Sequence, residues 1–178
     1  MERNIIKMAI PFPIITTERL NLRKVLPTDA ERVFYFRSNK EINKYIKRPP
    51  QTREMSIAHI QLLDYNLKTN KGISWGITTK DSNVIIGNIC LWNFSKDKKT
   101  AEVGYDLDPK FQGQGIMSEA LKAVLHFAFE IRGFETIEAY TDYRNIPSKK
   151  LLKLHGFIPN EGKKDTDNQN NEVFYINH

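Results

Sequence analysis

A glycine loop lies between the most regular strand pattern and the most regular helix pattern of this chain. Residues 100–108 alternate apolar and polar side chains, which is the period of a strand with one buried face. Residues 117–129 place apolar side chains at the i, i+3, i+4, i+7 spacing of an amphipathic helix. The loop Gln112-Gly113-Gln114-Gly115 joins the two segments. This strand–loop–helix unit predicts a mixed α/β fold, in which helices pack on a sheet.

The other segments extend this pattern in both directions. Strands are predicted over 17–25, 72–79, 83–93, 134–141, 157–159 and 172–176, and helices over 53–69 and 145–154, with a further helix opening at 27–31. Thr28 and Glu31 have the spacing of a capping box at the start of that helix. Gly87 interrupts a predicted strand, which indicates a bulge or the close approach of another backbone. We expect one domain over 1–178, with an N-terminal extension (1–15) and a core (16–176).

Composition excludes several classes of protein and leaves others open. With one cysteine, Cys90, no internal disulfide can form, which favours a reducing compartment. No stretch approaches the roughly 18 apolar residues that span a bilayer, and the N-terminus lacks a signal-peptide pattern, so we expect a cytoplasmic protein without membrane partners. The net charge of +6 serves solubility or attracts a phosphorylated ligand. The chain has no basic helix with interleaved aromatic residues, so nucleic-acid binding is not predicted. The four histidines do not cluster, so no metal site is predicted.

The glycine loop has two readings. Glycines at a helix N-terminus let backbone N–H groups approach a bulky anion, as in a pyrophosphate cradle, but they also form simple tight turns. The Gly-Lys-Ser/Thr of a Walker loop is absent. Ser118 is only a loose match to the third small residue of a dinucleotide fingerprint, and the loop lies too late in the chain for that motif.

Several motifs in order resemble one family. Residues 112–117 are similar to the Gln-x-x-Gly-x-(Gly/Ala) coenzyme A loop of the GNAT N-acetyltransferase superfamily, although Met117 replaces the usual small last residue. Residues 101–105 resemble the fourth strand of that family, and 145–157 resemble its fourth helix and exit. Residues 17–23 resemble the opening of the branch that acetylates the N-terminal alanine or serine of ribosomal proteins. The resemblance spans 16–176.

This resemblance implies a fold and a co-substrate. The implied fold is a mostly antiparallel sheet of six to seven strands, splayed after its fourth strand and flanked by four helices. Acetyl-coenzyme A would be the co-substrate, without a metal. The resemblance places coenzyme contacts at Leu107, Gln112, Gly113, Gln114, Gly115, Ile116, Met117, Ser118, Asn145 and Lys150.

The resemblance also assigns catalytic roles. Glu102 matches the position of the general base, with a paired or solvent-facing carboxylate as the alternative. A tyrosine that protonates the departing thiolate in many members is replaced by Leu152, so Ser148 becomes the candidate donor. Asn145 would hold the pantetheine or the amine, although Asn145 and Ser148 also suit ordinary helix capping. Transfer would be direct, with Cys90 a buried structural residue.

The acceptor is left open at this stage. The resemblance implies an amine-bearing acceptor: the N-terminal amine of a ribosomal or other protein, or alternatively a polyamine, amino sugar or amino acid. A non-catalytic acyl-coenzyme A sensor is a further alternative, which the missing tyrosine permits. Either a monomer or a homodimer is compatible with the sequence.

Overall fold

The chain folds around one twisted sheet, seen in a computed structural model that describes residues 11–178. The strands are β1 (Ile15–Thr16), β2 (Leu20–Lys24), β3 (Gly72–Thr79), β4 (Gly87–Trp92), β5 (Thr100–Leu107), β6 (Thr136–Asp142), β7 (Ile158–Pro159) and β8 (Asn171–Asn177). Their order is β1-β2-β3-β4-β5-β6-β8-β7, and β5–β6 is the parallel pair in an otherwise antiparallel sheet. The mostly antiparallel α/β sheet is as predicted. Its strand number is eight rather than six to seven, because Ile15 and Thr16, at the boundary between the expected extension and core, pair with β2 as β1.

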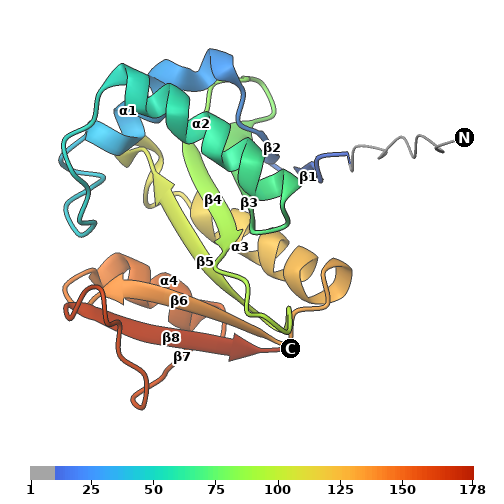
Figure 1. Ribbon diagram of the computed structural model, residues 1–178, viewed down its shortest axis with the longest axis vertical. Coiled ribbons are helices and arrows are strands. Elements are labelled where there is room, and N and C mark those ends of the chain that lie inside the picture. Colours follow the sequence, from blue (N-terminus) through green and yellow to red (C-terminus); the bar gives the residue numbers. More distant parts are fainter. Residues whose placement is uncertain (1–10) are drawn as a thin grey trace, which may run out of the picture.

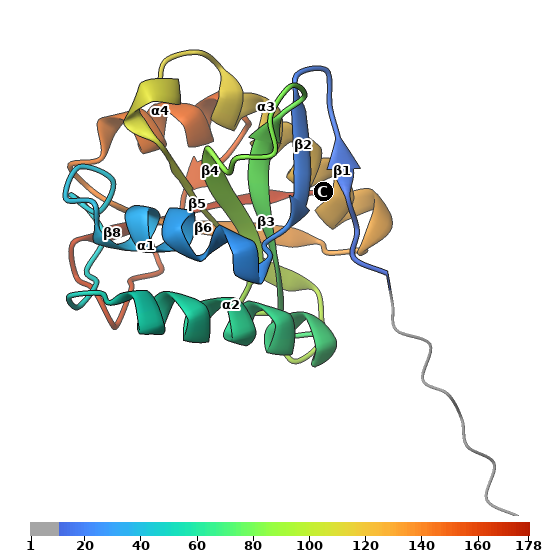
Figure 2. The same ribbon diagram turned by 90° about the horizontal axis from the view of Figure 1, so that it is seen from above.

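Helices cover both faces of the sheet (Figures 1 and 2). The elements are α1 (Ala30–Ser38) after a 3₁₀ turn (Pro27–Asp29), α2 (Arg53–Lys68), a 3₁₀ turn (Pro109–Phe111), α3 (Ile116–His126) with a π-helical continuation (Phe127–Ile131), and α4 (Ile146–Leu154). Helices α1 and α2 lie on one face of the sheet, and α3 and α4 lie on the other. We call these the α1/α2 face and the α3/α4 face.

Strand and helix periodicity place the core where the sequence predicts it. In β5, Ala101 and Val103 are buried among residues of α3, because alternate side chains of a strand share one face. The predicted apolar positions of α3 and its π-helical continuation are buried from Met117 to Ala128, and Phe129 is half-buried. Gly133, with a φ of +69°, follows the helical stretch. A smaller core under α1 and α2 holds Val25, Val33, Phe36, Ile60 and Ile85.

Gly87 is required by a close approach, as predicted. The regular strand begins at Gly87 rather than passing through it. A Cβ atom at this position would lie 2.8 Å from the carbonyl oxygen of Asp106 and 2.8 Å from a methyl group of Leu107. The end of β5 at Leu107 can therefore pair closely with the start of β4 only because residue 87 has no side chain.

The predicted capping box at Thr28 and Glu31 is wrong. The Glu31 carboxylate pairs instead with Arg53, 2.7 Å away on α2. The start of the helix is held by Asp29, whose carboxylate accepts the Leu26 N–H at 2.7 Å and pairs with Arg23. The reciprocal local bonds thus form two residues earlier, between Leu26 and Asp29, and Glu31 is free to pair with a distant helix.

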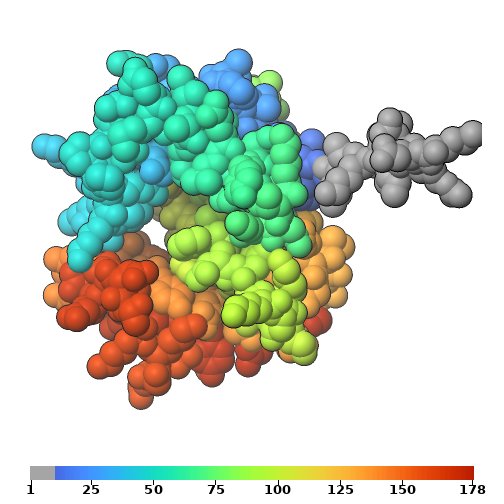
Figure 3. Space-filling view, viewed as in Figure 1, coloured from blue at the N-terminus to red at the C-terminus, as the bar shows by residue number. Residues whose placement is uncertain are grey.

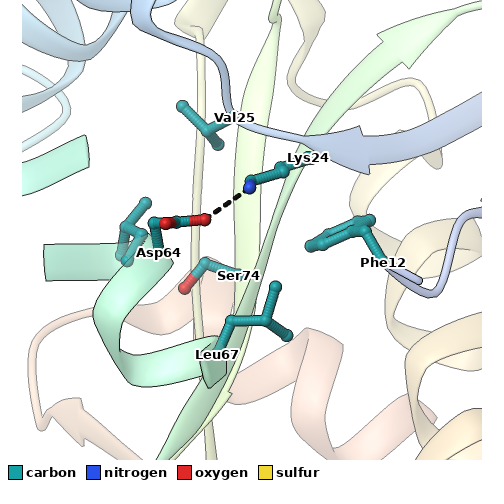
Figure 4. A pocket seen from close by; sticks show the side chains of 7 residues that line it. Phe12, Lys24, Val25, Asp64, Leu67 and Ser74 are labelled. Atoms are coloured by element: carbon teal, nitrogen blue, oxygen red, sulfur yellow. Dashed lines mark hydrogen bonds and ion pairs between the residues drawn. The ribbon is translucent and has the colours of Figure 1, made fainter. Parts of the chain in front are cut away.

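A small cavity between β2 and α2 is not a candidate site. Figure 4 shows the Lys24 ammonium directed at the Asp64 carboxylate beside Phe12, Leu67 and Ser74. Its volume of about 10 Å³ is at most that of one water molecule. In residues 11–178, no helix is long and apolar enough to cross a membrane.

Candidate active site

The sheet opens between β5 and β6. Only Thr100–Glu102 pairs with Thr136–Glu138, although β5 continues to Leu107 and β6 to Asp142. Beyond the third pair, the facing strand edges separate and no longer satisfy each other's backbone groups. This is the splay that the resemblance implies, and beyond it the facing edges of β5 and β6 have no partner strand in residues 11–178.

The glycine loop lies exposed at the start of α3. Gly113 and Gly115 have φ angles of +72° and +74°, a region that favours glycine. Within the described chain, none of the backbone N–H groups of residues 113–118 donates to a backbone acceptor or to a capping side chain. Six free donors at the positive end of a helix form an anion cradle, so the loop fits the pyrophosphate of coenzyme A.

The predicted loop residues contribute in different ways. The Gln112 side chain donates to the Leu107 carbonyl at 3.1 Å and so fastens the loop to the end of β5. The side chains of Leu107, Ile116 and Met117 are buried in the core. These three positions can therefore meet a ligand only through their backbone, which explains why Met117 can replace a small residue.

Arg19, the residue before β2, braces the loop. Its guanidinium donates to the Gln114 carbonyl at 3.0 Å and pairs with Glu119 at 2.6 Å. Glu119 also accepts the Thr17 hydroxyl at 2.6 Å. Burial raises the pKa of Glu119, but the hydrogen bonds from Thr17 and Arg19 outweigh this and hold it below its usual range. Sequence reasoning noticed residues 17–23 only as a motif and missed this link.

A hydroxyl pair lies on the α3/α4 face beside the splay. Tyr105 Oη and Ser148 Oγ are 2.9 Å apart. Burial raises the pKa of Tyr105 to about 12, against a lowering by the Ser148 hydrogen bond, so the phenol keeps its proton. Leu152, one turn further along α4, is fully buried and offers no proton. The sequence did not single out Tyr105, because its place in the alternation marks it simply as a core-facing residue.

Helix capping explains part of the Asn145 and Ser148 pattern. The Asn145 side-chain oxygen accepts the Ser148 N–H at 3.2 Å, so Asn145 is the N-cap of α4. This cap fixes the turn that carries the Ser148 hydroxyl. Lys150 is exposed, and it forms no ion pair within residues 11–178. The Ser118 hydroxyl lies 2.8 Å from His155 Nε2, which joins α3 to the end of α4.

Glu102 lies on the opposite face of β5 from the hydroxyl pair. Its one described hydrogen-bond partner is Asn93, at 3.4 Å. Burial raises its pKa to about 7, opposed by the Asn93 hydrogen bond. Neighbouring carboxylates differ, since Glu138 pairs with Lys163 at 2.7 Å and Asp142 with Arg144 at 2.7 Å. Glu102 therefore combines a near-neutral pKa with the absence of an ion pair in the described chain.

Cys90 lies on the same face as Glu102 and is poorly suited to nucleophilic chemistry. Burial raises the pKa of its thiol to about 12, against a smaller lowering by a backbone hydrogen bond of Gly104. Thiols react as thiolates, so this group is inert near neutral pH. Residues 11–178 contain no group of three or more His, Cys, Asp or Glu side chains arranged to hold a metal ion.

Comparison with known proteins agrees with this geometry. The family model for the acetyltransferase (GNAT) domain matches residues 19–158. An uncharacterized N-acetyltransferase of Bacillus subtilis (strain 168), YoaA, is 33% identical over 147 residues, covering 82% of this chain and 83% of that protein. A [ribosomal protein uS5]-alanine N-acetyltransferase of Escherichia coli (strain K12) is 27% identical over 168 residues, covering 88% and 84%.

A solved structure shares the fold. It is a ribosomal L7/L12 α-N-protein acetyltransferase in complex with coenzyme A, with a TM-score of 0.79, 20% identity, and coverage of 93% of this chain and 98% of that one. Acetyltransferases of this family use acetyl-coenzyme A as acyl donor, and the free N–H groups of the loop suit it. The chain belongs to the GNAT family and is an acetyl-coenzyme A-dependent N-acetyltransferase.

Proposed function

We propose that this enzyme acetylates the α-amino group at a protein N-terminus, with acetyl-coenzyme A as donor. The observation that carries the mechanism is the division of groups across β5. A carboxylate with a pKa near 7 lies on one face, and a hydroxyl pair lies on the other. The splay between β5 and β6 joins the two faces.

The donor would lie on the α3/α4 side of the splay. Backbone N–H groups of residues 113–118 would bind its pyrophosphate, and Gln112 and Arg19 hold that loop in place. Asn145 would help to position the pantetheine arm, and Lys150 is free to approach a phosphate. The acetyl-coenzyme A supplies an activated thioester.

Transfer would be direct. The amine nitrogen bonds to the acetyl carbon as the carbon–sulfur bond breaks. Glu102 takes the amine proton, directly or through water, and Ser148 gives its proton to the departing sulfur. Tyr105, hydrogen-bonded to Ser148, can resupply that proton. No step needs Cys90.

The pKa of Glu102 supports an α-amine as acceptor. An N-terminal amine has a pKa near 8 and a lysine side chain one of about 10.4. A base with a pKa of about 7 is closely matched to the former and poorly to the latter. The name of the Escherichia coli relative, which acts on a ribosomal-protein alanine, points the same way.

The test is turnover of acetyl-coenzyme A, followed as thiol release, against a panel of amines. The panel contains peptides with free N-terminal alanine, serine or methionine, the same peptides with blocked N-termini and an internal lysine, a polyamine, an amino sugar and free amino acids. We expect turnover with free N-termini and none with blocked ones. Turnover with small amines alone would replace the protein acceptor with a small molecule. Thermal stabilisation by coenzyme A without turnover of any amine would indicate a sensor.

A further inference from the structure

The segment that joins α1 to α2 is strongly basic. Residues 37–48 contain five lysines or arginines and one acidic residue, Glu41. Figure 3 shows the surface hollowed between this segment and the strands β6 and β8. Residues 44–47 border a cavity of about 80 Å³ there, together with Asp142 and Arg144 from the end of β6. The basic segment therefore overhangs the α1/α2 face of the sheet at the open end of the splay.

Arg37 is the unusual member of this segment. It is half-buried, and its guanidinium contacts only neutral groups: Gln51 Oε1 at 3.0 Å and His59 Nε2 at 3.4 Å. No carboxylate lies within 4 Å of it among residues 11–178. Burial and the nearby Arg48 lower its pKa, which marks an unfavourable position for an isolated cation.

His59 does not supply the missing negative charge. Burial lowers the pKa of His59 to about 4, and repulsion from Arg37 and Arg48 contributes to this. The ring is therefore neutral at physiological pH and can only accept a hydrogen bond from Arg37. Three basic side chains face this corner, and burial, with a smaller contribution from the two arginines, keeps His59 uncharged.

Asp106 is the carboxylate that faces these groups, and it is already shared. Arg48 approaches it at 3.5 Å, and Asn88 donates to it at 2.8 Å. Burial raises the pKa of Asp106, although Arg48 lowers it. Asp106 thus pairs with Arg48 alone, and Arg37 is left without a carboxylate partner within 4 Å in residues 11–178. Buried charges in proteins are normally paired, so this corner has the donors and the charge to take a further anion.

We propose that Arg37 and Arg48 form a subsite for an anionic group of the acceptor, a carboxylate or a phosphate carried near its amine. This inference rests on the proposed function, because it places the acceptor on the α1/α2 face with Glu102.

Asp106 and Glu102 are four residues apart on one face of β5, about 13 Å along a strand. An extended peptide covers that distance in about four residues. The anionic group would then belong to one of the first five residues of the substrate.

The experiment compares matched acceptors at low ionic strength. One arm uses peptides with a free N-terminus that carry aspartate or the isosteric asparagine at one position from two to five. Further arms use a phosphoserine peptide against its serine form, and glycine against glycinamide, so that protein and small-molecule sources of the anion are separated. We expect a kcat/KM about tenfold higher for the aspartate peptide at one position, declining with added salt.

Variants connect this preference to the subsite. Arg37→Gln should abolish the aspartate preference and leave the KM for acetyl-coenzyme A unchanged, whereas Arg37→Lys should keep part of the preference. Lys80→Gln is the matched control, because it removes one positive charge from the exposed turn after β3. It should retain the full preference.

The outcomes distinguish this inference from the proposed function. Equal kcat/KM for every charged and neutral pair, with peptides still acetylated, would overturn the subsite and leave the function intact. A preference confined to glycine over glycinamide would overturn the subsite as placed, because the carboxylate of glycine lies too close to its amine to span the distance from Glu102 to Arg37 and Arg48. If Arg37→Gln lowers thermal stability and leaves the aspartate preference unchanged, Arg37 is only structural and the inference is wrong.

Discussion

Tyr105 on β5 and Ser148 on α4 share a hydrogen bond of 2.9 Å between their hydroxyl groups. The Asn145 cap holds the Ser148 backbone at the same time, so the serine is fixed through both its main chain and its side chain. This arrangement places a positioned hydroxyl donor near the splay, although the usual tyrosine position is occupied by the buried Leu152. The proposed chemistry of thiolate release depends on this pair.

Ser148→Ala should lower kcat about 100-fold, the scale of a lost general acid, and leave the dissociation constant of acetyl-coenzyme A unchanged. Tyr105→Phe should lower kcat less, because the serine hydroxyl remains. Single-turnover kinetics and coenzyme titration measure the two effects separately. An unchanged kcat in Ser148→Ala would remove Ser148 from the mechanism.

Glu102→Gln should remove the acidic limb of the pH–rate profile. In the wild type, kcat/KM should rise with pH up to about 7, because the base must lose its proton. The variant should be slow and lack this limb. A profile with the same limb near pH 7 would assign the base to another group.

The same substitution should change stability in a pH-dependent way. The folded-state pKa of Glu102 is raised above its unfolded value, so the folded wild type binds more protons between about pH 4.5 and 7 and loses stability as the pH rises through that range. Glu102→Gln should therefore unfold at the same temperature as wild type at pH 4. At pH 8 it should be more stable by about 1–2 kcal/mol. Calorimetry at the two pH values checks the sign.

Arg19→Gln should weaken coenzyme binding without affecting the chemical step. It removes the hydrogen bond to the Gln114 carbonyl and the ion pair to Glu119, so the glycine loop loses its brace. We expect the KM for acetyl-coenzyme A to rise about tenfold, while kcat at saturation stays within about twofold. Lys80→Gln is the charge-matched control. A selective fall in kcat would show that Arg19 acts on the reaction centre instead.

Gly87→Ala should destabilise the protein by about 1–3 kcal/mol, the usual cost of overpacking. The new methyl group would meet the Asp106 carbonyl and Leu107 at 2.8 Å, and so would push β5 away from β4. Gly162→Ala is the comparison, because its Cβ would meet nothing closer than Asn160 at 3.7 Å. Urea unfolding of both variants measures the loss of stability. Equal unfolding midpoints would mean that β4 and β5 accommodate the added methyl group without cost, which would contradict the prediction.

Cys90 should be dispensable for acetyl transfer. With a thiol pKa of about 12, it should resist alkylation at pH 8 in the folded protein and react after unfolding. Cys90→Ala should keep kcat within about twofold. Loss of activity in this variant, together with a trapped acetyl-cysteine, would contradict direct transfer.

The sequence by itself determined the secondary-structure elements and the glycine loop. Strand alternation in 100–108, helical spacing in 117–129 and the glycines between them specify local conformation, and each depends only on residues a few positions apart. The requirement for glycine at 87 was also visible. These features sufficed to predict the α/β fold, the splay through family resemblance, and the loop at 112–118.

Only the tertiary structure decided which side chains meet. Arg19 reaches Gln114 across 95 positions, and Tyr105 reaches Ser148 across 43. Glu31 leaves its predicted local cap to pair with Arg53, and Arg37 finds no carboxylate partner in the described chain. Such contacts depend on strand register, helix placement and side-chain rotamers, which periodicity does not encode. The sequence therefore located the glycine loop, and the packing of distant elements selected its brace, the hydroxyl pair and the basic corner of Arg37 and Arg48.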